Sequence, residues 1–281
     1  MAGTRDLRGV LTSMSRPKAE AYFERHTRGI YLGGNRVLCK ILGNKKFFAL
    51  ADDRGFTPHM LFDGYWEFWL TTHFARMVNR GDVVLDIGAN LGYYTLVAAD
   101  LVGPEGSVVA VEANPAVHEL LHSNIDINGY SGFARAENFA LADQTDPPKR
   151  SFFVPTGEPK NGRLLEAAED ETLLSSNGQV FDVPVGQLSV SDFDRVDFIK
   201  IDVEGAELMV LQHLKPIIDA FRPKIVCEVN FWRGYSWNDL VALLGISGEL
   251  RHLDFDGEVK TLTQDMVREQ RVGDDWLVCW E

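Results

Sequence analysis

The sequence predicts an α/β fold in which helices cover both faces of a doubly wound, mostly parallel sheet of seven strands. Three observations support this fold class. Short apolar runs rich in β-branched residues alternate with helical segments from residue 82 onward. The first run passes directly into a glycine turn that opens a helix. A late turn at Asp256-Gly257 separates two further strands, which predicts an antiparallel strand at one edge of the sheet.

The individual elements follow from these patterns in chain order. The predicted strands, each an apolar run of strand length, are 82–87, 107–112, 133–140, 197–202, 224–229, 249–255 and 275–280. The predicted helices lie at 92–102, at 116–128, from near Glu204 to a stop before Arg222, and at 237–244. We predict that the third of these helices ends before Arg222 because Pro223 follows, and proline is common just beyond the end of a helix.

The chain of 281 residues has room for one large domain and an appendage. We predict a small N-terminal extension at 1–78, with a polar arm, two short strands and an aromatic-rich helix at 65–78. The aromatic rings are expected in the core, where they dock the extension onto the main domain at 79–281. The polar stretch at 143–190 is predicted to be an insertion on the acceptor side, with a hairpin near Phe152.

Composition narrows the function classes. The chain carries 28 basic and 41 acidic residues, a net charge of −13, and has no basic cluster. A nucleic-acid substrate is therefore not expected, because its phosphates would need a cationic surface. The three cysteines, Cys39, Cys227 and Cys279, are far apart and are predicted to be buried thiols of a reducing compartment. No apolar run reaches membrane length and no leader-like segment begins the sequence, so we expect no membrane span and a cytoplasmic location.

The stretch at 82–92, Asp-Val-Val-Leu-Asp-Ile-Gly-Ala-Asn-Leu-Gly, organises the main domain. Its apolar run is typical of a strand covered on both faces. Gly88 and Gly92 allow a tight turn and the close approach of a ligand, and the helix that follows presents unpaired N–H groups. The sequence thus predicts a cradle for a polar cofactor at the carboxyl end of a strand, with Asp86 beside it.

The missing glycines of this stretch narrow the choice of cofactor. A dinucleotide fingerprint needs three glycines, but Asn90 and Tyr93 occupy the second and third positions. The remaining pattern suits a cofactor without phosphate whose positive charge Asp86 helps to hold. Glu112 ends the second strand, where an acid grips a ribose diol. The alternative is an ordinary βαβ unit whose two acids cap helices.

A second informative stretch is 198–207, Phe-Ile-Lys-Ile-Asp-Val-Glu-Gly-Ala-Glu. Asp202 and Glu204 come at the carboxyl end of a central strand, where ligands of such sheets bind, and we favour a functional role for both. Lys200 shares a strand face with Asp202, and Glu228 on the next strand is its candidate ion-pair partner. For Lys200 and Glu207 we favour structural roles.

Four motifs together resemble the FkbM family of methyltransferases. They are Asp-Ile-Gly-Ala-Asn-Leu-Gly-Tyr-Tyr-Thr at 86–95, Glu-Ala-Asn-Pro at 112–115, Ala-Leu-Ala-Asp at 140–143 and Ile-Lys-Ile-Asp-Val-Glu-Gly-Ala-Glu at 199–207. The resemblance covers roughly residues 60–230. It implies a Rossmann-like class I methyltransferase fold, S-adenosyl-L-methionine as donor with S-adenosyl-L-homocysteine as product, and a hydroxyl acceptor on a sugar, glycolipid or polyketide.

The resemblance also implies site residues. It places the 86–92 turn around the methionine part of the donor, Glu112 on the ribose, and Asp202 near the transferred methyl group. Residues 138 and 139 would edge the adenine, and Glu67 would approach from a lead-in segment at 64–67. The predicted cofactor-binding residues are Glu67, Asp86, Gly88, Ala89, Asn90, Gly92, Glu112, Ala113, Asn138, Phe139 and Asp202.

Two other motifs point to different chemistry. His118-Glu119-Leu-Leu-His122 matches the zinc-protease pattern, but its helix is expected on the outer layer and Glu137 is the nearest acid that could serve as a third ligand. Asp-Pro-Pro-Lys at 146–149 is similar to a motif of nucleic-acid amino-methyltransferases, yet it follows the wrong strand and lacks the aromatic residue that stacks on a flipped base. We favour neither.

Methyl transfer to a hydroxyl needs the acceptor, methyl and sulfur atoms in line and a base for the proton. Our hypothesis is that Asp202 or Glu204 is that base. It leaves room for a divalent cation on these acids, although we predict no metal site. The alternative is that Asp202 only positions the donor and the base comes from 143–190 or the N-terminal arm.

Two rival functions are a non-catalytic cofactor-binding or scaffolding protein and a nicotinamide dehydrogenase. The sequence leaves the acceptor, a small molecule or glycan, and homo-oligomerisation open.

Overall fold

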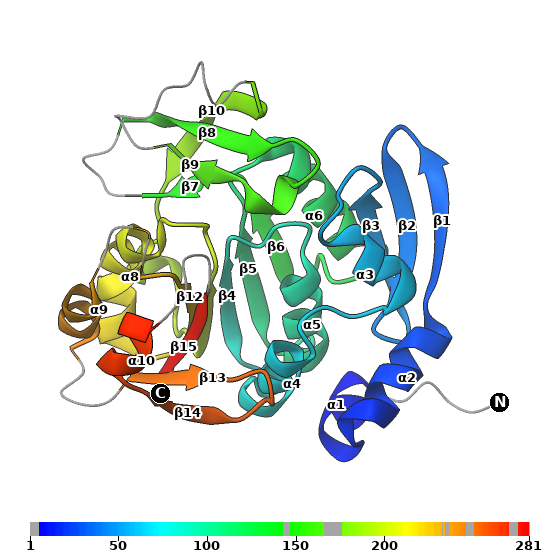
Figure 1. Ribbon diagram of the computed structural model, residues 1–281, viewed down its shortest axis with the longest axis horizontal. Helices are drawn as coiled ribbons and strands as arrows, with labels where there is room; N and C mark the ends of the chain where they lie inside the picture. The colour runs from blue at the N-terminus through cyan, green and yellow to red at the C-terminus, as the bar shows by residue number, and fades with distance from the viewer. Residues whose placement is uncertain are drawn as a thin grey trace.

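The computed structural model describes residues 6–142, 147–165, 176–231, 233, 236–245, 250–269 and 275–280. The main-sheet strands within these ranges are β4 (Val83–Ile87), β5 (Ser107–Val111), β6 (Ala134–Glu137), β11 (Phe198–Ile201), β12 (Lys224–Val229), β13 (Leu250–Leu253), β14 (Val259–Leu262) and β15 (Trp276–Trp280). Their order is β14-β13-β15-β12-β11-β4-β5-β6 (Figure 1). The five strands from β12 to β6 are parallel, and β15 is antiparallel to both of its neighbours.

This sheet confirms the predicted doubly wound α/β fold with antiparallel strands at one edge. It has eight strands in the described ranges where the sequence predicted seven. The additional strand is β14, which pairs with β13 across the turn at Asp256-Gly257. Its first three side chains are at least partly exposed, so it lacks the apolar run by which the other strands were predicted.

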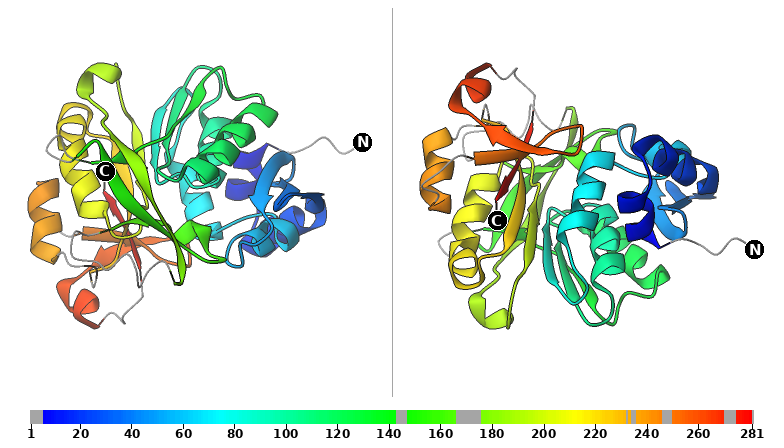
Figure 2. Two further views of the ribbon diagram at one scale, coloured as in Figure 1. Left: turned by 90° about the horizontal axis from the view of Figure 1, so that it is seen from above. Right: turned by 90° about the horizontal axis from the view of Figure 1, so that it is seen from below.

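Side chains of the central strands alternate between two separate cores. Val84 on β4 packs into one core, whereas Leu85 and Ile87 pack into the other. The first core contains α4 (Phe68–Met77), α5 (Tyr93–Val102) and α6 (Pro115–Ile127), and the second contains α8 (Glu207–Phe221), α9 (Trp237–Leu244) and α10 (Gln264–Glu269). The sheet is therefore the middle layer between two helical layers (Figures 1 and 2).

The N-terminal segment adds a second, three-stranded sheet. Its elements are α1 (Leu7–Ser13), α2 (Arg16–His26), β1 (Arg28–Gly33), β2 (Arg36–Ile41), β3 (Lys45–Leu50) and α3 (Thr57–Phe62). β2 and β3 are the two predicted short strands, and β1 and α3 were not predicted. The segment shares one continuous apolar core with α5 and α6. The division of the chain at residue 78 stays a prediction.

A buried amide joins this segment to the main domain. The Asn124 side chain on α6 is fully buried. Its Nδ2 donates to the carbonyl oxygens of Phe48 (3.0 Å) and Leu91 (2.8 Å), and its Oδ1 accepts from the Phe48 N–H at 2.6 Å. One side chain thus holds β3 against the turn that follows β4.

The insertion forms a small sheet of its own. The predicted strand 133–140 is divided, because β6 ends at Glu137 and the chain leaves the main sheet to form β7 (Ala140–Leu141). The insertion sheet has the order β7-β10-β8-β9 and includes β8 (Lys149–Pro155), β9 (Arg163–Leu164) and β10 (Gly178–Gly186). The hairpin predicted near Phe152 is confirmed by the pairing of β8 with β9 and β10. The predicted motif residues Asp143 and Asp146 lie outside the described residues.

The structure tests two of the predictions drawn from composition. Cys39, Cys227 and Cys279 are buried thiols, as predicted. Among the helices that the structure describes, none combines the length and the apolar character that a membrane crossing requires. The cytoplasmic location stays a prediction.

Candidate active site

Two adjoining cavities lie at the carboxyl ends of β4 and β11. The large cavity has a volume of about 770 Å³ and the small cavity about 80 Å³. Seven residues line both of them: Gly88, Asn90, Lys160, Leu164, Asp202, Glu204 and Ala206. The shared wall thus contains the glycine turn, the acids that follow β11, and two residues of the insertion. This is the sheet edge at which the sequence predicted a ligand.

The turn after β4 depends on Gly88. Its φ of +75° lies in the left-handed region, and a Cβ there would come within 1.8 Å of the Asp202 carbonyl oxygen. Only glycine allows β4 and β11 to continue this close together. Asn90 also has a positive φ, of 50°, and its side-chain Oδ1 accepts a hydrogen bond from the Leu91 N–H at 2.8 Å.

Glu112 at the end of β5 fixes the other side of the turn. Its two carboxylate oxygens accept hydrogen bonds from the N–H groups of Asn90 (2.9 Å) and Asn114 (2.8 Å). Burial raises the pKa of Glu112 to about 7, although both of these hydrogen bonds favour the ionised form. Glu112, Ala113 and Phe139 line the small cavity, and Glu67 and Ala89 line the large one.

Three predicted cofactor-binding residues lie behind the cavity walls. Asp86 has no exposed surface, and its Oδ2 accepts a hydrogen bond from the Thr95 hydroxyl at 2.6 Å. Gly92 begins α5 with a φ of 91°. Asn138 donates from Nδ2 to the carbonyl oxygen of Glu112 at 2.8 Å. None of the three lines either cavity, and their role in donor binding stays a prediction.

Lys200 is buried beneath the shared wall and pairs with two acids. Its Nζ donates to Asp202 Oδ2 at 3.1 Å and lies 3.7 Å from Asp86 Oδ1. The predicted pair with Glu228 is wrong, because Lys200 is the register partner of Asp86 on β4 and lies opposite Val226 on β12. Burial alone would lower the pKa of Lys200, but Asp202 and Asp86 raise it above its ordinary value. Lys200 therefore carries a permanent positive charge under Asp202.

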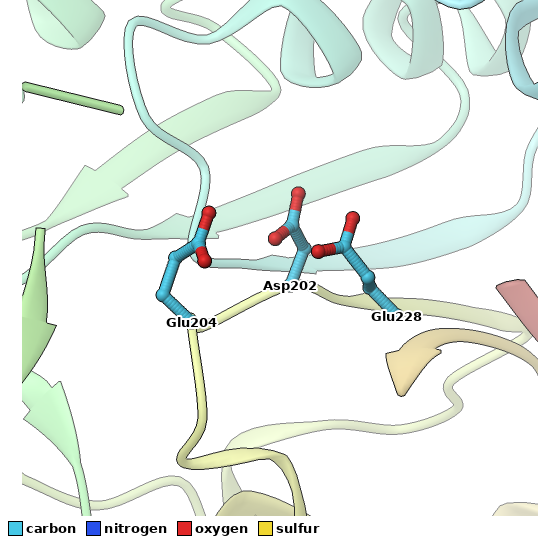
Figure 3. A group of neighbouring side chains, drawn as sticks. All are labelled: Asp202, Glu204 and Glu228. Carbon is cyan, nitrogen blue, oxygen red and sulfur yellow. The ribbon is translucent and has the colours of Figure 1, made fainter. Parts of the chain in front are cut away.

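Asp202, Glu204 and Glu228 form a cluster of carboxylates. They lie side by side with their carboxylate groups turned the same way (Figure 3). One oxygen from each lies within 4.8 Å of the others. Glu204 has a φ of 54°, a strained conformation for a residue with a side chain, and its carboxylate accepts a hydrogen bond from Arg233 at 2.9 Å.

Two members of this cluster, Glu204 and Glu228, bind protons more tightly than free carboxylates do. Burial raises the pKa of Glu204 to about 7, helped by Asp202 and opposed by Arg233. Burial, with Asp202 and Asp275 nearby, raises the pKa of Glu228 well above its ordinary range. Such a set can take a proton from a hydroxyl near neutral pH. It also has the oxygen ligands that hard divalent cations bind.

Glu67 enters the large cavity from the opposite side. It precedes α4 with a φ of 36°, which is why this helix begins at Phe68 and not at the predicted residue 65. Its Oε2 accepts a hydrogen bond from the Tyr94 hydroxyl at 2.7 Å. Burial raises the pKa of Glu67 to about 7, and the Tyr94 hydrogen bond acts against this rise.

Replacing Tyr94 by Phe is expected to raise the pKa of Glu67 above 7, because the hydroxyl that favours the ionised carboxylate is removed. A carboxyl with a folded pKa above its ordinary 4.5 favours folding below pH 4.5, and that contribution is lost as the pH rises through the folded pKa. The stability of Tyr94→Phe should therefore decline over a range that extends further to alkaline pH. NMR titration of the Glu67 carboxyl measures the pKa. The control is Tyr93→Phe, whose hydroxyl contacts Thr71 at 3.1 Å, and an unchanged Glu67 pKa in Tyr94→Phe would contradict the expectation.

Sequence reasoning missed much of the large cavity wall. The additional lining residues with polar, sulfur-containing or aromatic side chains include Trp66, Tyr94, Arg150, Lys160, Arg163, Met209, Glu228, Arg233 and Asp275. The insertion was predicted to face the acceptor, but no pattern within it singled out Arg150, Lys160 or Arg163. The Gly-Tyr-Trp-Glu lead-in at 64–67 was the available signal for Trp66.

The zinc-protease pattern lies elsewhere in the molecule. None of its residues lines either cavity. Glu119 pairs with Arg36 at 2.6 Å, and His122 lies 3.2 Å from Asp126 on the same helix. Arg36 is on β2, so this helix lies between the main sheet and the N-terminal sheet.

The chain is similar to known methyltransferases. The sequence model described as the methyltransferase FkbM domain matches residues 86–260. Methyltransferase 1 of Beauveria bassiana is 26% identical over 144 residues, which are 47% of this chain and 57% of that protein. The protein-L-isoaspartate O-methyltransferase of Ignicoccus hospitalis is 40% identical over 57 residues, 20% of this chain and 27% of that protein. The match thus spans just over half of the length of the Beauveria protein and about a quarter of the length of the Ignicoccus protein.

A solved structure, the methyltransferase FkbM from Methylobacillus flagellatus KT, aligns with a TM-score of 0.41 and 14% identity. The alignment covers 75% of this chain and 52% of that chain.

Proposed function

This chain belongs to the FkbM family of S-adenosylmethionine-dependent methyltransferases, and from that membership we propose that it methylates a hydroxyl oxygen of a small-molecule or glycan acceptor. The acceptor classes that we propose are sugars, glycolipids and polyketide-type natural products. The matched segment contains the glycine turn, Glu112 and the acids after β11. The proposal therefore concerns the site described above and assigns a role to each of its parts.

One observation carries the proposal: Gly88 meets the backbone of Asp202 at the wall shared by both cavities. We place the nucleoside of the donor beside Glu112, Ala113 and Phe139, partly in the small cavity and partly in the adjoining large cavity, because about 80 Å³ is too small for a whole nucleoside. The acceptor then occupies the rest of the large cavity. The cradle fits this donor because glycine leaves space at the turn, while Asn90 fills the space that a dinucleotide pyrophosphate needs.

When bound, the donor supplies an activated methyl group, and transfer forms an oxygen–carbon bond as the carbon–sulfur bond breaks. The side chains hold the acceptor oxygen in line with that bond at about 3 Å and take its proton. Asp202 or Glu204 is the proposed base. Lys200 donates a hydrogen bond to Asp202, and Arg233 donates one to Glu204 that favours its ionised form. We assign no metal to this chemistry.

Calorimetry tests the proposal before any acceptor is known. S-adenosylhomocysteine is expected to bind at one site per chain, at least about tenfold more tightly than NAD. The reason is that the turn has no second glycine for a pyrophosphate. Binding of NAD without binding of S-adenosylhomocysteine would overturn the assignment. Donor binding with no methyl transfer to any hydroxylated acceptor would favour a scaffolding role.

A further inference from the structure

Lys160 lies where the two cavities meet. It is in η1 (Pro159–Asn161), the single helical turn between β8 and β9 of the insertion. It is one of the residues that line both cavities, and its side chain is partly buried. No motif in the sequence marked it.

The Lys160 side chain is held in place by its surroundings. Its Nζ lies 5.4 Å from the centre of the Trp66 ring. A Cβ at Gly55 would come within 2.7 Å of Lys160 Cε, so the lysine stem packs directly on the Gly55 backbone. The Arg54 N–H also donates to the Gly157 carbonyl oxygen at 3.0 Å, which ties this part of the insertion to the N-terminal segment. The ammonium group is therefore positioned and does not swing freely in solvent.

Within the described part of the chain, Lys160 forms no ion pair and its ammonium group donates no hydrogen bond. Its charge acts on Asp53 and Glu67 from beyond ion-pair distance. Asp53 Oδ1 instead accepts hydrogen bonds from the N–H groups of Gly55 and Phe56. Glu67 accepts a hydrogen bond from the Tyr94 hydroxyl. The other cavity lysine, Lys200, pairs with two acids. A positioned ammonium group with no ion-pair partner among the described residues is suited to an anionic group of a ligand.

We propose that Lys160 binds a ligand carboxylate at the junction of the two cavities. The inference rests on the proposed function and deepens it. Two carboxylates have the right chemistry: that of the amino-acid end of the donor, and one carried by the acceptor. The donor is the nearer source, because a nucleoside beside Glu112 and Phe139 directs its amino-acid end toward the shared wall.

The first test compares two ligands by calorimetry. S-adenosylhomocysteine carries the amino-acid end, and 5′-methylthioadenosine has the same thioether nucleoside without it. Lys160→Met is expected to weaken S-adenosylhomocysteine binding about tenfold or more and to leave 5′-methylthioadenosine binding unchanged. Lys149→Met is the matched control, since Lys149 is an exposed lysine of the same insertion outside both cavities. Lys160→Arg, which keeps the charge, should restore most of the affinity.

A second test covers the acceptor. Protein saturated with S-adenosylhomocysteine is titrated with citrate, in the wild type and in Lys160→Met. Citrate binding that is lost in the variant, with unchanged S-adenosylhomocysteine affinity, assigns the carboxylate to the acceptor. Equal S-adenosylhomocysteine affinities together with no Lys160-dependent citrate binding overturn the proposal. Failure of the wild type to bind S-adenosylhomocysteine counts against the proposed function itself, so the two failures are distinguishable.

Discussion

Replacing Asp202 by Asn is expected to lower turnover at neutral pH by about 10²–10⁴-fold, the usual contribution of a general base, while donor binding is kept. Asp202 follows β11 and accepts a hydrogen bond from the Lys200 ammonium group at 3.1 Å. It lies beside Glu204 and Glu228 (Figure 3). Asparagine keeps the shape of the side chain but cannot take the proton of the acceptor. Turnover is measured with a hydroxylated acceptor chosen on the wild type, and donor binding by calorimetry.

The pH dependence separates the two candidate bases. If Asp202 is the base, turnover of Asp202→Asn should recover partly at high pH, where hydroxide or the ionised acceptor replaces it. If Glu204 is the base, wild-type turnover rises with pH through about 7, and Glu204→Gln removes that rise. Asp265→Asn removes an equal charge from an exposed site on α10 and should change neither profile. Lost donor binding in Asp202→Asn would rule out the base role and leave only donor positioning.

Replacing Gly88 by Ala is expected to destabilise the fold by about 3 kcal/mol or more and to abolish donor binding. The new Cβ would lie 1.8 Å from the Asp202 carbonyl oxygen, a backbone atom that cannot rotate away. Relief requires β4 and β11 to separate at their carboxyl ends, where we propose that the donor binds. Urea unfolding gives the stability change, and calorimetry with S-adenosylhomocysteine gives the binding change.

Gly81→Ala is the matched control for this substitution. Gly81 also has a positive φ, of 82°, but a Cβ there meets only the Glu105 carbonyl oxygen at 4.0 Å. It should therefore show the conformational cost alone, about 1–2 kcal/mol, with donor binding kept. Similar losses in the two variants would mean that backbone conformation, and not the approach of Asp202, makes Gly88 necessary.

The predictable parts of the fold are those fixed by local patterns. The central strands β4, β5 and β12 are β-branched runs buried on both faces, and α9 lies at its predicted 237–244. The elements that were missed lack such a pattern. β1 has five exposed residues out of six, and β14 is half exposed; both depend on pairing with a neighbour at a sheet edge. Their partners, β2 and β13, lie close by in the chain, but neither missed strand has the apolar run of strand length that would mark it as a strand.

The same distinction applies to the site. Gly88, Glu112 and Asp202 were predicted because each directly follows a central strand, and Glu204 because it comes two residues after Asp202. Parallel strands bring their carboxyl ends together. Lys160 could not be predicted as a cavity residue, because its position depends on how the hairpin of β8 and β9 in the insertion packs against the rest of the protein. The predicted ion-pair partner of Lys200 was wrong because Lys200 lies in register with Asp86 on β4, a strand more than a hundred residues earlier in the sequence.

The buried amide of Asn124 has a consequence for how this enzyme can be trimmed. Its partners Phe48 and Leu91 belong to the N-terminal sheet and to the turn after β4. A truncated chain starting at residue 79 would leave that amide half unsatisfied and strip the cover from the apolar face of α5 and α6. Residues 79–281 therefore cannot be transferred to another protein on their own. A fusion that uses this methyltransferase has to include the N-terminal sheet, β1 to β3.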